Sequence, residues 1–368
     1  MNDKFHTLTL LALVVLLASA NQANATAYEL TILGMSGVDS AAYAINNSGQ
    51  VAGMNNYRAT VWNGTTATDL GSGYVFAISN NGQMVGQSNG YATLWNGTST
   101  TNLGVAYATA INNTGQVSGW SSAPDFGNAY YSVHTVHATI WNGTTATDLG
   151  TLGGMSSYAT AINDKGQVAG WSYLTGNHSN INGWPITHAT IWNGTTLTDL
   201  GTLGGATSEA NAMNNDGQVA GKSFIVGDRA EHATLWSGTT ATDLGTLGGD
   251  FSEAKAINNV GQMAGKSLIA GNGNWHAALW NGTTITDLNS FLDVSVVNAG
   301  WVLNEAYKIN DNGWIVGNAS NHLLGISSNA FLMSVAAVPE PETYTIFLAG
   351  LCLIGFMARR KKLKDDMA

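Results

Sequence analysis

The chain has 368 residues, of which 44% are hydrophobic and only 10% are charged, so a large core is expected and long charged surface helices are not. The formal net charge of −10 argues against a nucleic-acid-binding protein, because phosphate recognition needs clustered Lys and Arg. The one cysteine, Cys352, lies in an apolar C-terminal segment, which excludes a disulfide scaffold and a thiol nucleophile in the body of the chain.

Residues 1–27 have the order of a secretory signal peptide. Lys4 supplies a basic start, residues 8–18 form an apolar stretch, and Ala-Asn-Ala at 23–25 offers small residues for cleavage. We expect a signal helix that is removed after Ala25 or Ala27. A buried N-terminal helix is the alternative interpretation.

Residues 28–335 contain one sequence unit seven times. Ala-Ile-Asn-x-x-Gly-Gln-Val starts a unit at Ala44, Ala110 and Ala161, and related copies place their turn glycine at Gly82, Gly217, Gly261 and Gly313. A second motif, Ala-Thr-(Ile or Leu)-Trp-Asn-Gly-Thr-Thr, lies between these copies. A third, Thr-Asp-Leu-Gly, follows it at Asp69, Asp148, Asp199, Asp243 and Asp287, with Asn102 as a variant. The tryptophans of the second motif are Trp62, Trp95, Trp141, Trp192, Trp236 and Trp280, with Met333 at the seventh place.

Each unit is predicted to form four short strands. β-branched and aromatic residues fill the four segments, and turn residues separate them. Asn-Gly pairs such as Asn63-Gly64 and Asn142-Gly143 predict two-residue hairpins with a type I′ turn, and Asn-x-x-Gly predicts a longer hairpin with Gly in the left-handed region.

Seven four-stranded antiparallel units predict an all-β fold, a seven-bladed β-propeller. Residues 28–34 resemble the fourth strand of a unit, whereas the last unit, ending near Met333, has only three segments. We therefore expect the N-terminal strand to complete the last blade on its outer side and to close the ring. The Ala-x-Ala-Ile-Asn strand would then be innermost, where small residues fit. A straight β-solenoid is the rival fold.

The repeat motifs His-Ala-Thr-(Ile or Leu)-Trp, Asp-Leu-Gly-Thr-Leu-Gly-Gly and Ala-Ile-Asn-x-x-Gly-Gln-Val resemble extracellular HAF repeats over most of residues 28–335. Thr usually stands in place of the family's Phe, although Ala330-Phe331 keeps part of that element. The resemblance implies an extracellular location and brings no established catalytic activity.

The C-terminal segment has three parts in a fixed order. A linker at 336–343 contains Val338, Pro339, Glu340 and Pro341; an apolar run at 344–358 follows; and Arg359, Arg360, Lys361 and Lys362 begin a basic tail at 359–368. We expect residues 344–358 to form a transmembrane helix. It is about 22 Å long, which is short for a membrane span unless its flanks help, and the basic cluster would stay cytoplasmic. The order resembles the PEP-CTERM sorting signal of Gram-negative bacteria. It implies transient anchoring in the inner membrane and processing by an exosortase.

The repeated polar residues have structural explanations. His137, His188, His232 and His276 recur before the third strand and could in principle bind a metal, but equivalent positions in different blades lie far apart. We expect repeat-determined packing or strand-end hydrogen bonding for them, and turn capping for the Asp of Thr-Asp-Leu-Gly. The Asn-rich turns at 214–217 and 310–313 faintly resemble calcium loops but lack enough carboxylates, so a hairpin is favoured. We predict no cofactor and no metal.

The connection between the second and third strands is long in two units, at residues 120–137 and 171–188. Loops on a rigid scaffold commonly carry binding, and exposed aromatic rings stack on sugars or anchor partner proteins. The candidate ligand face consists of Trp120, Phe126, Tyr130, Tyr131, Trp171, Tyr173 and Trp184. These aromatics could instead cover apolar blade edges.

These observations predict an exported surface or matrix protein that binds exopolysaccharide or an envelope protein and is not an enzyme. The alternative is an extracellular glycan hydrolase or lyase. It needs two acids that break the repeat, and Asp125 and Asp228 are the candidates.

Overall fold

The computed structural model describes residues 28–34, 39–97, 99–122, 135–176, 185–194 and 196–335, and within them the fold is all-β. The strands form five sheets of four strands and one sheet of eight. The eight-stranded sheet consists of two four-stranded antiparallel groups joined by a single parallel pair, Glu231 with Phe251. The prediction of an all-β fold built from four-stranded sheets is confirmed. We call each four-stranded group a unit and number the units along the chain.

The strands of the units are as follows. Unit 1 comprises β2 (Ser40–Ile45), β3 (Gln50–Asn55), β4 (Arg58–Asn63) and β5 (Thr66–Ser72), and unit 2 comprises β6 (Tyr74–Ile78), β7 (Gln83–Ser88), β8 (Tyr91–Asn96) and β9 (Ser99–Gly104). Unit 3 comprises β10 (Ala106–Ile111), β11 (Val117–Ser122), β12 (Val136–Asn142) and β13 (Thr145–Asp148), and unit 4 comprises β14 (Gly153–Ile162), β15 (Val168–Leu174), β16 (Thr187–Asn193) and β17 (Thr196–Asp199). Unit 5 comprises β18 (Gly204–Met213), β19 (Val219–Ile225), β20 (Glu231–Ser237) and β21 (Thr240–Asp243), and unit 6 comprises β22 (Gly248–Ile257), β23 (Gln262–Ile269), β24 (Trp275–Asn281) and β25 (Thr284–Asp287). Unit 7 comprises β26 (Trp301–Ile309), β27 (Ile315–Asn321), β28 (Ile326–Val335) and β1 (Tyr28–Ile32).

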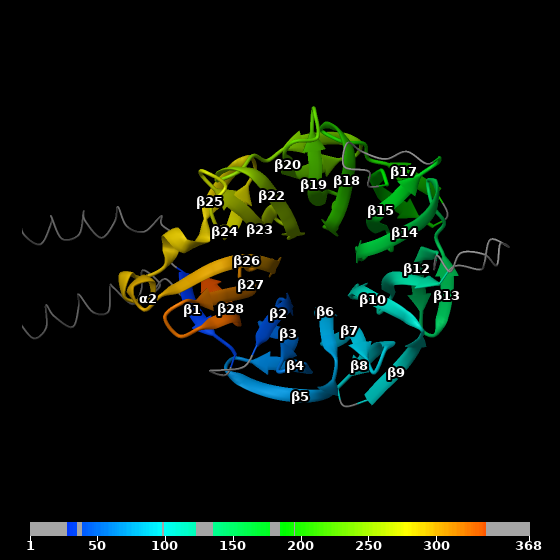
Figure 1. The fold of residues 1–368 in the computed structure, drawn as a ribbon. Helices are drawn as coiled ribbons and strands as arrows, with labels where there is room; N and C mark the ends of the chain where they lie inside the picture. Colours follow the sequence, from blue (N-terminus) through cyan, green and yellow to red (C-terminus); the bar gives the residue numbers. More distant parts are fainter. Residues whose placement is uncertain are drawn as a thin grey trace, which may run out of the picture. The chain divides into compact units, whose positions relative to one another are not determined.

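The units of residues 28–334 lie around a common centre (Figure 1). Two residues from the first strand of each unit line one central cavity, so these strands are innermost, as the sequence predicts. In unit 7 the order is β1-β28-β27-β26, which places the N-terminal strand at the outer edge beside the last strand. Units 7 and 1 also meet directly, because the side-chain amide of Asn310 donates to the carbonyl of Asn46 at 3.0 Å.

Two short helices, η1 (Leu288–Phe291) and α2 (Val294–Asn298), join units 6 and 7. Asp287 caps the first and Asp293 caps the second through side-chain oxygens that accept backbone N–H groups. Within the part of the chain that the structure describes, no helix is long and apolar enough to cross a membrane. The predicted signal helix at 1–27 and the predicted span at 344–358 lie outside the described residues.

The Asn-Gly hairpins have two-residue turns, but the predicted turn type is wrong. Asn63 pairs with Thr66, so Asn63 is the last strand residue and Gly64 is the first residue of the turn. Gly64 has φ of 59°, and Thr65 does not have positive φ. Positive φ at the first central position alone is the pattern of a type II′ turn, which prefers Gly there. A one-residue difference in register therefore decides the turn type. The Asn-x-x-Gly hairpins are as predicted, with Gly49 at φ of 81°.

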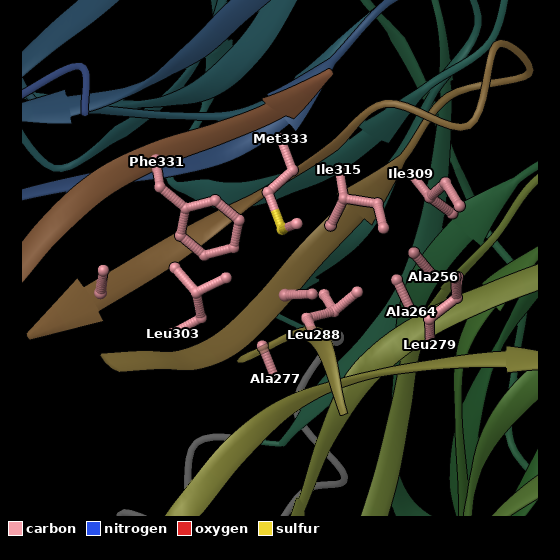
Figure 2. Close-up of a cluster of buried hydrophobic side chains, with 12 residues drawn as sticks. Ala256, Ala264, Ala277, Leu279, Leu288, Leu303, Ile309, Ile315, Phe331 and Met333 are labelled. Atoms are coloured by element: carbon pink, nitrogen blue, oxygen red, sulfur yellow. The ribbon is translucent and has the colours of Figure 1, made fainter. Parts of the chain in front are cut away.

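The core lies between neighbouring units. The repeated tryptophans of the third strands are all buried, and Met333 takes their place in unit 7. Figure 2 shows the cluster between units 6 and 7, where Phe331, Met333 and Leu303 pack over Leu288 and the alanines of unit 6. Tyr28, Leu30 and Ile32 of β1 pack against the same cluster. Truncating a buried Phe or Trp costs about 3–5 kcal/mol, so these positions hold the units together.

Candidate functional site

One position of the repeat changes chemistry from unit to unit while its backbone stays constant. It is a pair formed by one residue of the first strand and the residue opposite it on the second strand. The first-strand residue lies three positions before the first residue of that strand that lines the central cavity. The pair therefore lies at the end of the two strands that is remote from the Asn-x-x-Gly hairpin. The seven pairs are Ala41 with Met54, Tyr74 with Gln87, Tyr107 with Trp120, Tyr158 with Trp171, Glu209 with Lys222, Glu253 with Lys266, and Glu305 with Asn318. We call this set the pair ring.

A conserved backbone geometry places every pair. The residue before the second-strand member is Gly in all seven units, and a Cβ on Gly119 or Gly170 would overlap the carbonyl of Tyr107 or Tyr158. Glycine therefore lets the two inner strands approach closely next to the pair. The glycine recurs in every unit, so the pairs differ chiefly in their side chains, although unit 7 has an additional register shift between Leu303 and Glu305.

Units 3 and 4 carry the aromatic half of the pair ring. Tyr107 stacks on Trp120 with ring centroids 4.0 Å apart, and Tyr158 stacks on Trp171 at the same distance. The edge of Trp120 meets Tyr158 at 5.5 Å, and Tyr173 meets Trp171 edge-on at 5.8 Å. The five rings form one continuous row, which we call the aromatic row. Tyr107 is 37% exposed and the others are half-buried, so the row presents apolar ring surface to solvent.

Units 5 to 7 carry the ionic half. Lys222 lies 3.4 Å from both Glu209 and Glu231, and Lys266 lies 3.5 Å from Glu253. Two lysines converge on one carboxylate oxygen of Glu305, with Lys255 at 2.9 Å and Lys266 at 3.0 Å.

This network sets the charge states of its members. Burial disfavours the charged form of Glu253, but Lys255, Lys222 and Lys266 outweigh it and hold the pKa of that carboxyl below its ordinary value. Burial likewise opposes the charge of Lys222, and Glu209 and Glu231 outweigh it and raise the pKa of the amine. Glu253 and Lys222 therefore stay charged at neutral pH as paired, partly buried ions.

A pocket of about 480 Å³ opens beside the ionic half, between units 6 and 7. This volume lies in the range of small-molecule sites. Lys266, Trp275, Asn304, Asn318, Ser320 and His322 are among its lining residues. The Lys266 amine lies 4.8 Å from the centre of the Trp275 ring, which is 36% exposed.

The side chain of Asn318 in this pocket has only part of its hydrogen bonds satisfied. Its side-chain amide donates to the hydroxyl of Tyr307 at 3.0 Å, which fixes the orientation of the group. Its Oδ1 is buried and has no hydrogen-bond partner among the described residues. A buried acceptor without a partner is costly, so this amide is an energetically unfavourable point in the pocket wall. A flat aromatic ring beside amides, a hydroxyl and ions is suited to a polyhydroxylated ligand.

Part of the predicted ligand face is brought together. Trp120, Trp171 and Tyr173 all belong to the aromatic row. Phe126, Tyr130, Tyr131 and Trp184 lie outside the described residues. The prediction missed Tyr107 and Tyr158, as well as the whole ionic half. An alignment of the seven units would have found them, since the residue after the second-strand Gly varies among Met, Gln, Trp, Lys and Asn.

The recurrent His and Asp residues make the strand-end contacts expected from the sequence. His188 Nδ1 lies 2.8 Å from Asp199 Oδ2, and Asp199 Oδ1 also accepts the backbone N–H of Gly201. The same arrangement recurs at His137 with Asp148, His232 with Asp243, and His276 with Asp287. In the described ranges, no three His, Cys, Asp or Glu side chains are grouped as metal ligands.

The Asn-rich turns form a belt of hydrogen bonds around the cavity. In each unit, the backbone N–H of the residue after Asn46 or its equivalent donates to the side-chain oxygen of the corresponding residue in the next unit, at 2.8–3.0 Å. The side-chain oxygens of Asp164 and Asp311 accept hydrogen bonds in this belt.

Of the two acids considered for catalysis, Asp125 lies outside the described residues. Asp228 has φ of 53° and accepts the backbone N–H of Ala206 at 2.7 Å. In unit 6, Asn272 makes the equivalent bond to Asp250. Asp228 therefore has a turn-stabilising contact that an amide fulfils equally well.

Comparison with known proteins identifies the C-terminal segment. Residues 337–361 match the model of the PEP-CTERM protein-sorting motif, a range that contains Val338, Pro339, Glu340, Pro341, Arg359, Arg360 and Lys361. The predicted sorting signal is confirmed: the chain is exported to the cell surface or exterior and sorted by an exosortase.

No curated protein sequence matches the chain. Among solved structures, it is similar to the β-propeller domain of the Trilobed protease from Pyrococcus furiosus, which has an open velcro topology. The TM-score is 0.46 with 11% sequence identity, and the alignment covers 68% of this chain and 80% of that one.

Proposed function

We propose that this exported chain is a non-enzymatic surface or matrix protein that binds polysaccharide through the pair ring. The observation that carries the proposal is the placement of a half-exposed aromatic row and a polar pocket at one variable position of an otherwise uniform repeat. Aromatic rings bind the apolar faces of sugar rings, whereas amides and ions bind hydroxyl groups.

The proposal also covers the detailed arrangement of the seven units and the location of the chain. We interpret the units as seven blades of a closed β-propeller of HAF repeats, completed by β1. The order of unit 7 and the bond from Asn310 to Asn46 support this closure. We further propose that the apolar run 344–358 anchors the chain in the inner membrane until an exosortase processes it, and that the chain then joins the exopolysaccharide of a biofilm.

Calorimetric titration of the purified chain with polysaccharides selected on a glycan array tests the binding. Trp120→Ala and Trp171→Ala each remove a ring from the aromatic row, and central aromatic contacts usually contribute more than about 1.4 kcal/mol, a factor of about ten in Kd. We expect at least a tenfold weaker Kd for either variant. Trp120→Phe keeps a stacking ring on Tyr107 and is the matched control, with a Kd within about threefold of the original.

Three results would contradict the proposal. The first is the absence of binding to any glycan together with capture of an envelope protein, which would assign the face to protein recognition. The second is unchanged affinity in both Ala variants. The third is release of reducing ends from a polysaccharide by the original chain, lost in a single Asp→Asn variant, which would make the protein a hydrolase.

A further inference from the structure

The innermost strand of unit 7 breaks the repeat at its smallest position. Six units have Ala there: Ala44, Ala77, Ala110, Ala161, Ala212 and Ala256. Unit 7 has Lys308 instead. A long cationic side chain at this place is not needed for the fold, because six other units form the same strand with a methyl group.

Lys308 lines the central cavity. Two residues of each inner strand surround this space of about 160 Å³, and all of them are Ala, Ile or Met except Lys308. One enclosed water needs only about 15 Å³, so the cavity has room for an ion together with water. Lys308 is the one charged side chain among these lining residues.

The amine of Lys308 has no counter-ion among the described residues. No described carboxylate lies within ion-pair distance of it, and it makes no side-chain hydrogen bond to the described part of the chain. Acids on the inner strands and their turns are engaged elsewhere: Glu253 and Glu305 bind Lys255 and Lys266, while Asp164 and Asp311 accept hydrogen bonds in the belt of Asn-rich turns.

The surroundings of Lys308 also shift the pKa of its amine. Burial, and secondarily the charge of Lys255, lower the pKa of Lys308 to about 8. The amine therefore still carries its proton in most molecules at neutral pH, in a cavity whose other lining side chains are apolar. A partly buried cation without a counter-ion is unfavourable unless a negative charge accompanies it.

We propose that the central cavity binds one small inorganic or carboxylate anion, of the size of chloride or formate, on the amine of Lys308. The anion supplies the counter-charge that the described residues lack, and it also reduces the repulsion between Lys308 and Lys255. The alanine and isoleucine walls exclude large anions. This site is separate from the pair ring and does not depend on polysaccharide binding.

The test uses the full chain, purified in mild detergent in sodium gluconate, a large anion. Replacing gluconate by chloride or formate at constant ionic strength keeps screening unchanged, so a change reports binding alone. We expect saturable heat in calorimetry and a rise in Tm with chloride and formate. Lys308→Ala should weaken this binding at least tenfold. That variant restores the residue of the other six units and is therefore expected to fold.

Lys165→Met is the matched control, since it removes an exposed lysine that does not line this cavity and should leave chloride binding unchanged. A crystal grown in bromide should show one anomalous peak beside Lys308, absent in Lys308→Ala. The proposal is overturned if chloride binds equally to Lys308→Ala, if Lys165→Met abolishes the binding, or if neither anion produces saturable heat.

Discussion

Two tryptophans at the same repeat position differ in one hydrogen bond, which permits a sharp test of the energetics of the core. Trp236 and Trp280 are both fully buried on the third strands of units 5 and 6. The indole N–H of Trp280 donates to the carbonyl of Leu244 at 3.0 Å. The indole N–H of Trp236 has no acceptor among the described residues. Phe in either place leaves a similar void, so the cavity contribution cancels when the two variants are compared.

The polar contributions have opposite signs. Trp280→Phe breaks a bond and leaves the carbonyl of Leu244 without this donor, which costs about 1–3 kcal/mol. Trp236→Phe removes a buried N–H that has no partner, which relieves a penalty of about 1–3 kcal/mol. We therefore expect Trp280→Phe to be more destabilising than Trp236→Phe by at least about 2 kcal/mol.

Urea unfolding followed by far-UV circular dichroism measures both free energies of unfolding without depending on the removed fluorophore, provided the m values agree. Trp192→Phe is the control, because Trp192 is equally buried and its N–H also lacks a partner among the described residues. It should behave like Trp236→Phe. Equal losses at positions 236 and 280, or a larger loss at 236, would refute the reasoning.

Two further predictions concern ionisable groups around the central cavity. Asp164→Asn should lower the free energy of unfolding by about 1–3 kcal/mol, because one Asp164 oxygen accepts from the amides of Asn113 and Asn215 and an NH₂ group cannot. Burial raises the pKa of Asp164, but hydrogen bonds from the backbone N–H of Asn113 and from the amides of Asn113 and Asn215 outweigh it and hold the pKa below the ordinary value. The stabilisation is therefore present above about pH 5 and is lost as the pH falls through the folded-state pKa. In urea titrations at several pH values, the free energies of unfolding of the original chain and of Asp164→Asn should converge in acid. A difference that stays constant with pH would contradict this account. Lys308→Ala, in gluconate, should raise stability by at most about 3 kcal/mol below pH 8, since the original chain must partly desolvate a cation there. The folded-state pKa is about 8 and the ordinary value is 10.5, so the original chain regains stability between these two pH values and the gain disappears above them. A gain that is independent of pH would show that the amine charge is not its cause.

The candidate site was only partly predictable from sequence. Trp120, Trp171 and Tyr173 were selected as aromatics beside long loops, and the structure joins them in one row. Tyr107 and Tyr158 were missed because each lies thirteen residues before its partner tryptophan, and only the antiparallel register makes them neighbours. The convergence of Lys255 and Lys266 on Glu305 joins two units, and no spacing within a single unit indicates it.

The sequence by itself determined the strands, the hairpin positions, the inner place of the Ala-Ile-Asn strand and the pairing of β1 with the last unit. These features follow from local periodicity and from a repeat whose first and last parts complement each other. Only the tertiary structure decided the turn type at Gly64, the belt of hydrogen bonds between units and the isolation of Lys308. Each of these depends on register or on contacts between units, where the backbone brings together residues that are about 30 to 260 positions apart in the chain.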